Sequence, residues 1–306
     1  MRTILVTGGT GFIGSHTSIG LLLRGYKICI LDSLVNSKKD VLQKIKSLTL
    51  HVSQIRSSSI DFVNCDIRDS DTLEKVFIKF QREGNPIDAV LHFAGLKAVG
   101  ESVKFPIEYW DNNVGGTINL LRVMRKYNCK TIIFSSSASI YGDTNKEYLD
   151  ENTVVNPANP YAKTKSTIEG YLKDIFDSDP NSWRIANLRY FNPIGAHPSG
   201  EIGENPLGIP NNIFPKLIKV ACKEIQKIEV FGRDWDTPDG TGIRDYIHVM
   251  DLAEGHICAL EYLRKNSSKF INLNLGTGKG YSVLDLIHTF SITNNVKIPY
   301  IFAPKR

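Results

Sequence analysis

The sequence predicts an α/β fold in which a doubly wound parallel sheet is followed by a smaller C-terminal domain. Short apolar runs alternate with amphipathic stretches through the first 190 residues. Several of these runs are continuously hydrophobic, as expected for strands that are buried on both faces of a parallel sheet. The first run leads into a glycine-rich turn and then a helical pattern, which is the order in which Rossmann-type sheets begin.

The elements of the predicted sheet follow one another along the first part of the chain. The apolar runs predict strands at residues 4–6, 27–31, 60–65, 89–93, 131–135 and 185–190. The amphipathic stretches between them predict helices at residues 15–24, 72–82, 114–126 and 161–175. Because strands and helices alternate, we expect right-handed crossovers that place helices on both faces of the sheet.

The composition changes after Tyr190. Residues 191–212 are rich in proline and glycine, and loops this long in a compact enzyme usually surround a ligand. Further elements are predicted as a helix after Pro210, a strand at 228–231, a helix at 249–263 and a strand at 298–303. We therefore expect a domain boundary near residue 190, with about residues 244–265 returning to pack on the first domain.

The composition is that of an ordinary globular protein and argues against several kinds of partner. Hydrophobic residues make up 42% of the 306 positions, and the formal net charge of +5 comes without a long basic run, which gives little support to nucleic-acid binding. No apolar stretch approaches the ~18 residues of a membrane span, and the first residues enter a predicted core strand without room for a signal peptide. Five scattered cysteines without a C-x-x-C pair indicate reduced thiols. We therefore expect a cytoplasmic protein with neither a membrane nor a nucleic acid as partner.

The glycine-rich turn at residues 7–14 predicts a dinucleotide-binding site. Gly9, Gly11 and Gly14 fit the pattern G-x-G-x-x-G, and Gly8, Gly11 and Gly14 fit G-x-x-G-x-x-G. Glycine is needed here for a tight turn, for close approach of the backbone to a pyrophosphate, and for close packing of helix on strand. The amide groups at the start of the following helix then face the negative charge.

Asp32 ends the second predicted strand, near the offset of ~20 residues expected for the acid that binds a ribose. A carboxylate there accepts from the adenosine 2′-hydroxyl and repels a 2′-phosphate, which favours NAD over NADP. Lys38 and Lys39 lie nearby in the sequence and would suit a phosphate. Asp66 could reach the adenine or could cap its own loop, and Lys97 could meet a ribose or a phosphate.

Tyr161 and Lys165 form the most informative pair in the chain. Residues four apart share one face of a helix, so the Lys165 ammonium can lie beside the Tyr161 phenol. A nearby positive charge favours the phenolate and lowers the tyrosine pKa toward working pH. Ser137 ends a run of three serines upstream. Together with the dinucleotide turn, these residues predict the transfer of a hydride and a proton.

Four segments resemble the extended short-chain dehydrogenase/reductase family and, within it, enzymes that act on nucleotide sugars: residues 92–102, 134–142, 189–193 and 242–249. The resemblance covers essentially the whole chain. It implies an NAD-binding Rossmann domain over residues 1–190 and a UDP-sugar-binding domain over residues 191–306.

The resemblance also implies roles for individual residues. Tyr161 would be the catalytic base, and Lys165 would hold the nicotinamide ribose. Ser137 would form a hydrogen bond with the reacting sugar oxygen and so also belong to the substrate-binding residues. UDP would be bound by Asn192, Asn212, Arg244 and Arg306. Arginine suits that task because its planar fork pairs phosphate oxygens bidentately. The cofactor would be contacted by Gly8, Gly11, Phe12, Ile13, Gly14, Asp32, Asn36, Asp66, Ile67, Phe93, Ala94, Gly95, Lys97, Asn112, Tyr161, Lys165 and Tyr190.

The activity implied by the resemblance is that of an isomerase that interconverts UDP-galactose and UDP-glucose. Tightly held NAD would oxidise sugar C4 transiently, through a 4-keto intermediate, and return the hydride to the opposite face. By the same resemblance, the helices at residues 114–126 and 161–175 pair across a two-fold axis, so a homodimer is expected.

Three alternative functions compete with this one. A nucleotide-sugar 4,6-dehydratase places an acid just after its serine or threonine, whereas Ala138 and Ser139 follow Ser137 here. An ordinary NAD-dependent alcohol dehydrogenase or ketoreductase needs no residues that bind a substrate diphosphate, whereas Asn192, Asn212 and Arg244 are expected to do so here. A non-catalytic NAD-binding scaffold is expected to have lost the tyrosine or the lysine. No metal site is expected, because the histidines form no ligand pattern, and His92 and His248 are predicted as hydrogen-bonded core residues.

Overall fold

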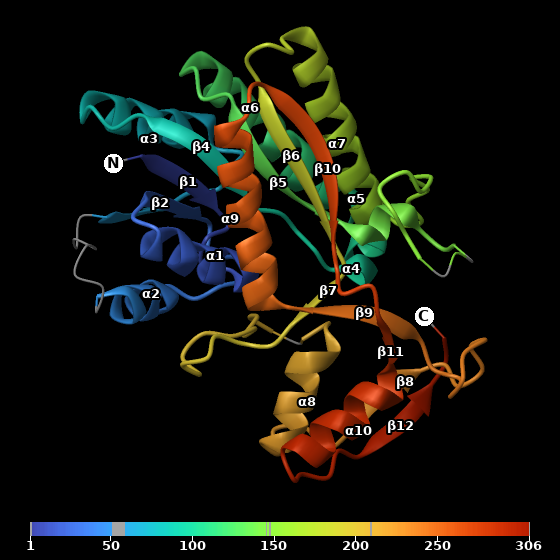
Figure 1. Cartoon of the computed structure of the whole chain (residues 1–306). Coiled ribbons are helices and arrows are strands. Elements are labelled where there is room, and N and C mark those ends of the chain that lie inside the picture. The colour runs from blue at the N-terminus through green and yellow to red at the C-terminus, as the bar shows by residue number, and fades with distance from the viewer. Residues whose placement is uncertain (1, 51–58, 145, 147, 209, 306) are drawn as a thin grey trace.

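The centre of the molecule is a seven-stranded sheet whose neighbouring strands are all parallel (Figure 1). The computed structural model describes residues 2–50, 59–144, 146, 148–208 and 210–305. The strand order is β10-β6-β5-β4-β1-β2-β3, so the order reverses between β1 and β4. The strands are β1 (Thr3–Thr7), β2 (Lys27–Asp32), β3 (Ile60–Asn64), β4 (Ile87–His92), β5 (Thr131–Ser137), β6 (Arg184–Tyr190) and β10 (Lys269–Leu275). This confirms the doubly wound parallel sheet and each of the six strands predicted for it.

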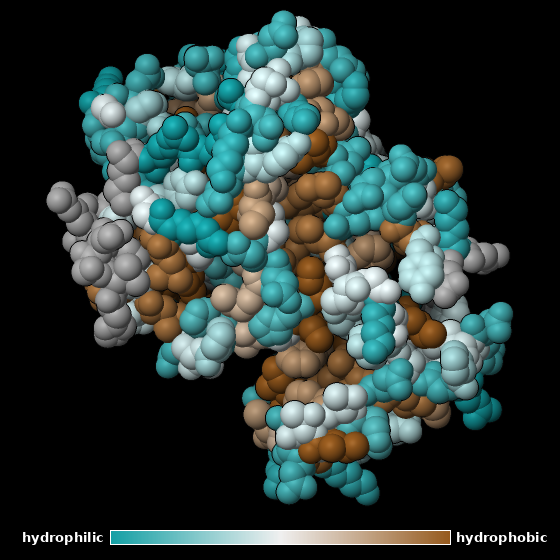
Figure 2. All heavy atoms as spheres, viewed as in Figure 1, coloured by the Kyte–Doolittle hydropathy of each residue, from teal (hydrophilic) through white to brown (hydrophobic). Residues whose placement is uncertain are grey.

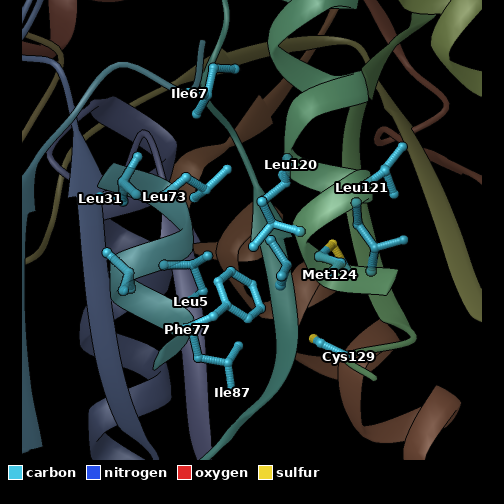
Figure 3. Close-up of a cluster of buried hydrophobic side chains, with 14 of the residues drawn as sticks. Leu5, Leu31, Ile67, Leu73, Phe77, Ile87, Leu120, Leu121, Met124 and Cys129 are labelled. Carbon is cyan, nitrogen blue, oxygen red and sulfur yellow. The ribbon is translucent and has the colours of Figure 1, made fainter. Parts of the chain in front are cut away.

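Helices cover both faces of this sheet. One face carries α3 (Ser70–Arg82), α6 (Gly116–Lys126) and α7 (Pro160–Ser178), and the other carries α1 (Phe12–Leu23), α2 (Val41–Thr49) and α9 (Val249–Lys265). On the first face, Leu120, Leu121 and Met124 of α6 belong to one cluster of buried side chains with Phe77 of α3 and Leu5 of β1 (Figure 3). Burial of apolar surface of this kind is the main favourable contribution to folding.

The residues before α6 depart from the regular helix. Residues 99–115 form α4 (Val99–Lys104), α5 (Pro106–Tyr109) and a π-helical turn, η2 (Trp110–Gly115). The helix predicted at residues 114–126 therefore begins at Gly116 and is preceded by the π-helical turn. Such turns are rare and occur frequently at functional sites.

The chain returns to the large sheet after it has left it. α9 packs against α1, and β10 pairs with β6 along its whole length (Figure 1). The buried residues of α9 include Leu252, Ile257, Leu260 and Leu263, which lie on one face at helical spacing. Residues 249–275 thus belong to the domain of the seven-stranded sheet. The predicted boundary at residue 190 therefore does not divide the chain into two continuous domains.

A smaller lobe is built from the remaining C-terminal elements. It contains α8 (Ile213–Ala221), α10 (Val283–Thr293) and the parallel pair β8 (Ile228–Phe231) and β12 (Tyr300–Ala303). Its own core includes Leu217, Val230 and Ile287. A three-stranded sheet links the lobe to the large sheet, and it consists of β7 (Asn192–Ile194), β9 (Ile243–His248) and β11 (Gly280–Ser282). On the face seen in Figure 2, apolar residues continue from the β10 edge of the large sheet down to the lobe.

No helix in the described part of the chain is both long enough and apolar enough to span a membrane.

Candidate active site

The site lies where the carboxyl ends of the parallel strands face the smaller lobe. A single cleft of about 2270 Å³ is lined by residues that directly follow or end β1, β2, β4, β5 and β6, together with residues of the loop 195–212 and of β9. Open α/β sheets bind ligands at this edge, beside the point where the strand order reverses. Every predicted site residue in the described ranges lines this cleft, whereas Arg306 lies outside the described residues.

The glycine-rich turn forms one end of the cleft and fits a dinucleotide. A Cβ at Gly14 would lie 2.3 Å from the carbonyl oxygen of Gly8, and a Cβ at Gly8 would lie 2.7 Å from the amide nitrogen of Ala94. Gly8 also has a φ of +69°, which favours glycine. The turn therefore presents bare backbone to the cleft at the start of α1, as a pyrophosphate requires.

Asp32 is held in a fixed orientation at the end of β2. Its carboxylate accepts hydrogen bonds from the amides of Thr10 (3.0 Å) and Leu34 (2.9 Å) and from the hydroxyl of Ser37 (3.1 Å). The side chain is largely buried, so little of it is free to move. This placement suits the predicted contact with a ribose hydroxyl.

Two further residues of the cofactor set already have protein partners. Asp66 forms an ion pair with Arg68 at 2.7 Å, and the hydrogen bond with Arg68 holds the pKa of the Asp66 carboxyl below its ordinary value. Asn36 accepts from the amide of Leu207 at 3.1 Å, which ties the loop after β2 to the loop 195–212. Asp66 therefore shows the loop-capping role that the sequence left open, while still lining the cleft.

The centre of the cleft holds Tyr161, Lys165 and Ser137. Asn159 caps the start of α7 by accepting from the amide of Ala162 at 2.9 Å, and this fixes Tyr161 in the first turn of the helix. One turn later, the Lys165 ammonium donates to the carbonyl oxygen of Ser135 at 2.8 Å and lies 5.9 Å from the centre of the Tyr161 ring. The predicted pair is therefore side by side, with both residues buried.

The ionisation of this pair differs from the expectation drawn from the sequence. Burial raises the pKa of the Tyr161 phenol above its ordinary value, and the hydrogen bond with Ser137 opposes that rise. Burial lowers the pKa of Lys165 to about 8, while the negative charge of Glu169 opposes that change. Desolvation is thus the largest influence on both groups, because burial disfavours the charged form of each.

Glu169 and Arg189 form a buried ion pair behind the catalytic residues. The shortest contact between them is 2.7 Å, and both side chains are more than nine-tenths buried. Glu169 also accepts from the hydroxyl of Ser136 at 2.5 Å, and Arg189 donates to the phenol oxygen of Tyr141 at 3.1 Å. The network joins α7, β5 and β6 next to Lys165, Ser137 and Tyr190. Sequence reasoning missed Glu169 and included Arg189 only in the segment 189–193, without a role of its own.

Asn113, not only the predicted Asn112, supports the cofactor side of the cleft. Asn112 lines the cleft, whereas Asn113 is buried in the π-helical turn and bonds both backbone groups of Leu96 at 2.8 and 3.0 Å. Asn113 also donates to the hydroxyl of Thr164 at 3.1 Å, next to Lys165 on α7. A single helical register places one asparagine toward the cleft and the other toward the fold, and sequence alone does not distinguish them.

The two histidines predicted as core residues have different environments. His92 is buried between the hydroxyls of Thr7 (2.7 Å) and Thr117 (2.9 Å), and burial lowers its pKa to about 3. His248 is exposed and caps α9 by accepting from the amide of Met250 at 3.2 Å, so the prediction for His248 was wrong. In the described ranges, no group of three or more His, Cys, Asp or Glu side chains is placed to hold a metal ion.

The three described UDP-binding candidates line the cleft from the linking three-stranded sheet and from the residue before α8. Asn192 begins β7, Asn212 precedes α8, and Arg244 lies in β9. Asp245 accepts instead from Thr277 and Gly278, and no carboxylate in the described part of the chain forms an ion pair with Arg244. The Arg244 guanidinium is exposed in the cleft, where its fork could pair an anionic ligand.

Comparisons with known proteins agree with this geometry. The bifunctional protein gal10 of Schizosaccharomyces pombe is 51% identical over 310 residues, which cover 99% of this chain but only 42% of that protein. The chain therefore spans less than half the length of this curated relative. UDP-glucose 4-epimerase of Bacillus subtilis is 48% identical over 99% of this chain and 85% of its own length.

A solved structure and a family model complete the comparison. The crystal structure of UDP-glucose 4-epimerase from Bifidobacterium longum in complex with NAD+ and UDP matches with a TM-score of 0.92 and 46% identity. The match covers 100% of this chain and 87% of that one. The model of the NAD dependent epimerase/dehydratase family matches residues 4–276. The family model covers most of the chain, and the chain contains the strand–turn–helix and the Tyr161–Lys165 pair described above. The chain therefore belongs to the NAD dependent epimerase/dehydratase family.

Proposed function

We propose that this chain interconverts UDP-galactose and UDP-glucose, with NAD as a resident cofactor. The observation that carries the proposal is the convergence of three residue sets in one cleft: the glycine turn with Asp32, the pair Tyr161 and Lys165, and the polar residues of the smaller lobe. Relatives named UDP-glucose 4-epimerase that match nearly the whole chain support the choice of substrate.

The residues that would hold NAD follow from the cleft. The bare backbone at Gly8 and Gly14 suits the pyrophosphate, and the fixed carboxylate of Asp32 suits the adenosine ribose. Lys165, anchored on Ser135, suits the nicotinamide ribose. When bound, NAD supplies the acceptor and donor of the C4 hydride.

The protein's own chemistry is the movement of one proton. Tyr161 takes the proton of the sugar 4-hydroxyl and later returns it, while Ser137 bonds the same oxygen and steadies it as its charge changes. Burial keeps the pKa of the Tyr161 phenol high in the protein alone. Positive charge brought into the cleft by the cofactor would favour the phenolate and so oppose this effect of burial.

Inversion at C4 also requires that the sugar be able to turn. Asn192, Asn212 and Arg244 lie on the lobe side of the cleft and would hold the nucleotide and its diphosphate. If the protein binds the diphosphate and makes few contacts with the sugar, the sugar ring can rotate and turn its other face toward the nicotinamide. Because the hydride returns to the same carbon, no second substrate is consumed.

A 4,6-dehydratase is the alternative that the family description leaves open. That reaction needs an acid beside the reacting serine to remove water. Here Ser139 donates to the Ser137 hydroxyl oxygen at 2.9 Å, and Ala138 lies between them. A serine hydroxyl is a poor acid, so the geometry favours epimerisation.

We also propose that the protein is a homodimer in the cytoplasm. Val103, Phe105 and Ile107 are exposed on α4, α5 and the segment that joins them, and α7 packs beside these elements. An exposed apolar patch of this kind favours association. The five cysteines are free thiols, which suits a reducing compartment.

The experiment that tests the activity is incubation with UDP-galactose, without added cofactor, followed by separation of the nucleotide sugars. We expect UDP-glucose to form with the wild-type protein and with Tyr262→Phe, which changes an exposed tyrosine on α9. Tyr161→Phe should lose activity by at least about a hundredfold, because the proton acceptor is gone. If UDP-galactose is unchanged even with added NAD, or if Tyr161→Phe is as active as Tyr262→Phe, the proposal fails.

A further inference from the structure

Glu204 is a buried carboxylate that lies inside the ligand cleft and has no part in the mechanism above. It lines the cleft from the loop 195–212, and its side chain is only 5% exposed. Burial of a carboxylate is costly unless donors compensate the lost hydration. The contacts of Glu204 therefore indicate what the residue does.

One carboxylate oxygen of Glu204 joins the two sides of the cleft. Glu204 Oε1 lies 3.1 Å from the ammonium of Lys97, which follows β4 on the cofactor side. The same oxygen accepts from the side-chain amide of Asn212 at 2.6 Å, on the lobe side. The other oxygen, Oε2, is buried and receives no hydrogen bond from any residue in the described ranges.

The Asn212 side chain does not cap the helix that it precedes. Asn212 occupies the N-cap position of α8, where an asparagine side chain commonly accepts from the first amides of its own helix. Here it makes no such bond, and its amide donates to Glu204 instead. The Asn212 side chain is thus oriented by Glu204 and not by a capping bond to its own helix.

The loop that carries Glu204 is itself anchored. Ile202, two residues earlier, is buried in the core beneath α1 and α9. The amide of Leu207, three residues later, donates to Asn36 on the cofactor side at 3.1 Å. Glu204 thus acts from a fixed position between two tethered points of the backbone.

We infer that Glu204 is a positioning residue that ties Lys97 on the dinucleotide side to Asn212 on the nucleotide-sugar side. The inference rests on the proposed function, which assigns these two sides to NAD and to UDP. Through Glu204 the position of Lys97 determines the orientation of the Asn212 amide, so the two halves of the cleft are set together. Charge-assisted hydrogen bonds to one oxygen have the strength and direction that such a tie requires.

The first measurement is the dissociation constant of UDP, determined by calorimetry on the protein as purified with its cofactor. Glu204→Ala releases the Asn212 amide, so we expect UDP binding to weaken about tenfold. Glu204→Gln keeps an acceptor for Asn212 and should weaken UDP binding less than about threefold. Glu229→Ala, which changes an exposed residue of β8, is the control and should bind UDP normally.

A double-mutant cycle with Lys97→Met separates the tie from damage to the fold. In the wild-type background, Lys97→Met should weaken UDP binding about threefold, because Glu204 loses its cation. In the Glu204→Ala background it should have no further effect. If Glu204→Ala does not fold, the cycle is run with Glu204→Gln, in which the charge pair is also lost.

The outcomes distinguish this inference from the proposed function. If the wild-type protein does not bind UDP, the proposed substrate is wrong and the inference falls with it. If the wild type binds UDP and Glu204→Ala binds it equally well, the inference alone is overturned. Equal effects of Lys97→Met in both backgrounds would likewise overturn it, because Lys97 would then act on UDP without Glu204.

Discussion

The Lys165 ammonium donates a hydrogen bond of 2.8 Å to the main-chain carbonyl oxygen of Ser135. This contact anchors the lysine to β5 two residues before the catalytic serine, so strand and helix hold fixed positions relative to each other. Burial nevertheless lowers the pKa of Lys165 to about 8, and the nearby negative charge of Glu169 opposes this change by favouring the protonated form. The ionisation of the site is thus a property of the fold around it.

In protein freed of dinucleotide, the Tyr161 phenol should lose its proton at higher pH than an exposed tyrosine does. Burial raises its pKa, and a raised pKa means that the neutral form persists above pH 10, where an exposed tyrosine would already be losing its proton. The measurement is the difference in tyrosinate absorbance between the wild type and Tyr161→Phe as pH is raised from 7 to 10. We expect this difference to be smaller in this range than an exposed tyrosine would give.

Addition of NAD to the same samples provides the control. The positive nicotinamide favours the phenolate, so a tyrosinate signal should then appear at lower pH in the wild type and not in Tyr161→Phe. A midpoint below pH 10 without dinucleotide would contradict the prediction, since desolvation could not then be the dominant effect.

Loss of Glu169 should destabilise the fold strongly. Glu169→Gln leaves the Arg189 guanidinium buried without its counter-charge, and breaking a buried pair in this way costs about 3–5 kcal/mol. The measurement is the free energy of unfolding in urea. Lys173→Gln, which removes the exposed pair with Asp177 on the same helix, should cost less than about 1 kcal/mol. Equal, small losses in both variants would show that the buried pair is dispensable.

Much of this architecture could be predicted from local patterns, and the failures have physical causes. The six strands and the glycine turn are recognisable because each is a short segment with its own periodicity. β10 was missed because Lys269, Asn272 and Asn274 interrupt its apolar residues, and its pairing with β6 bridges some eighty positions. The predicted direction of the Tyr161 pKa shift was wrong, because the spacing of residues reveals a neighbouring charge but not the loss of hydration on burial.

The candidate site shows the same division. Residues in motifs were brought together in the cleft as expected, whereas Glu204, Glu169 and Asn113 were missed. Their roles depend on partners far along the chain: Glu204 meets Lys97 more than a hundred residues away, and Asn113 meets Thr164. Buried polar pairs of this kind follow from tertiary packing, which a single sequence does not display.

Ile107→Glu should convert the proposed dimer into a monomer. Ile107 is 78% exposed, as Val103 and Phe105 of the same segment also are in large part, and a charge there cannot be buried without a partner. The measurement is molar mass by light scattering during size-exclusion chromatography. Ile292→Glu, on the exposed surface of α10 in the smaller lobe, is the matched control and should leave the mass unchanged. A dimeric Ile107→Glu, or a monomeric wild type, would contradict the proposed interface.

Gly14→Ala should abolish the stabilisation of the protein by NAD. The added methyl would lie 2.3 Å from the Gly8 carbonyl oxygen, so the turn must open where the pyrophosphate would sit, at a cost of about 1–3 kcal/mol. Gly100→Ala is the matched control, because its Cβ would meet no atom within 4 Å and alanine favours the helix α4. A ligand that binds only the folded protein raises the unfolding temperature by mass action. Addition of NAD should therefore raise that temperature in the wild type and in Gly100→Ala but not in Gly14→Ala, and an equal rise in all three would show that the turn does not hold the cofactor.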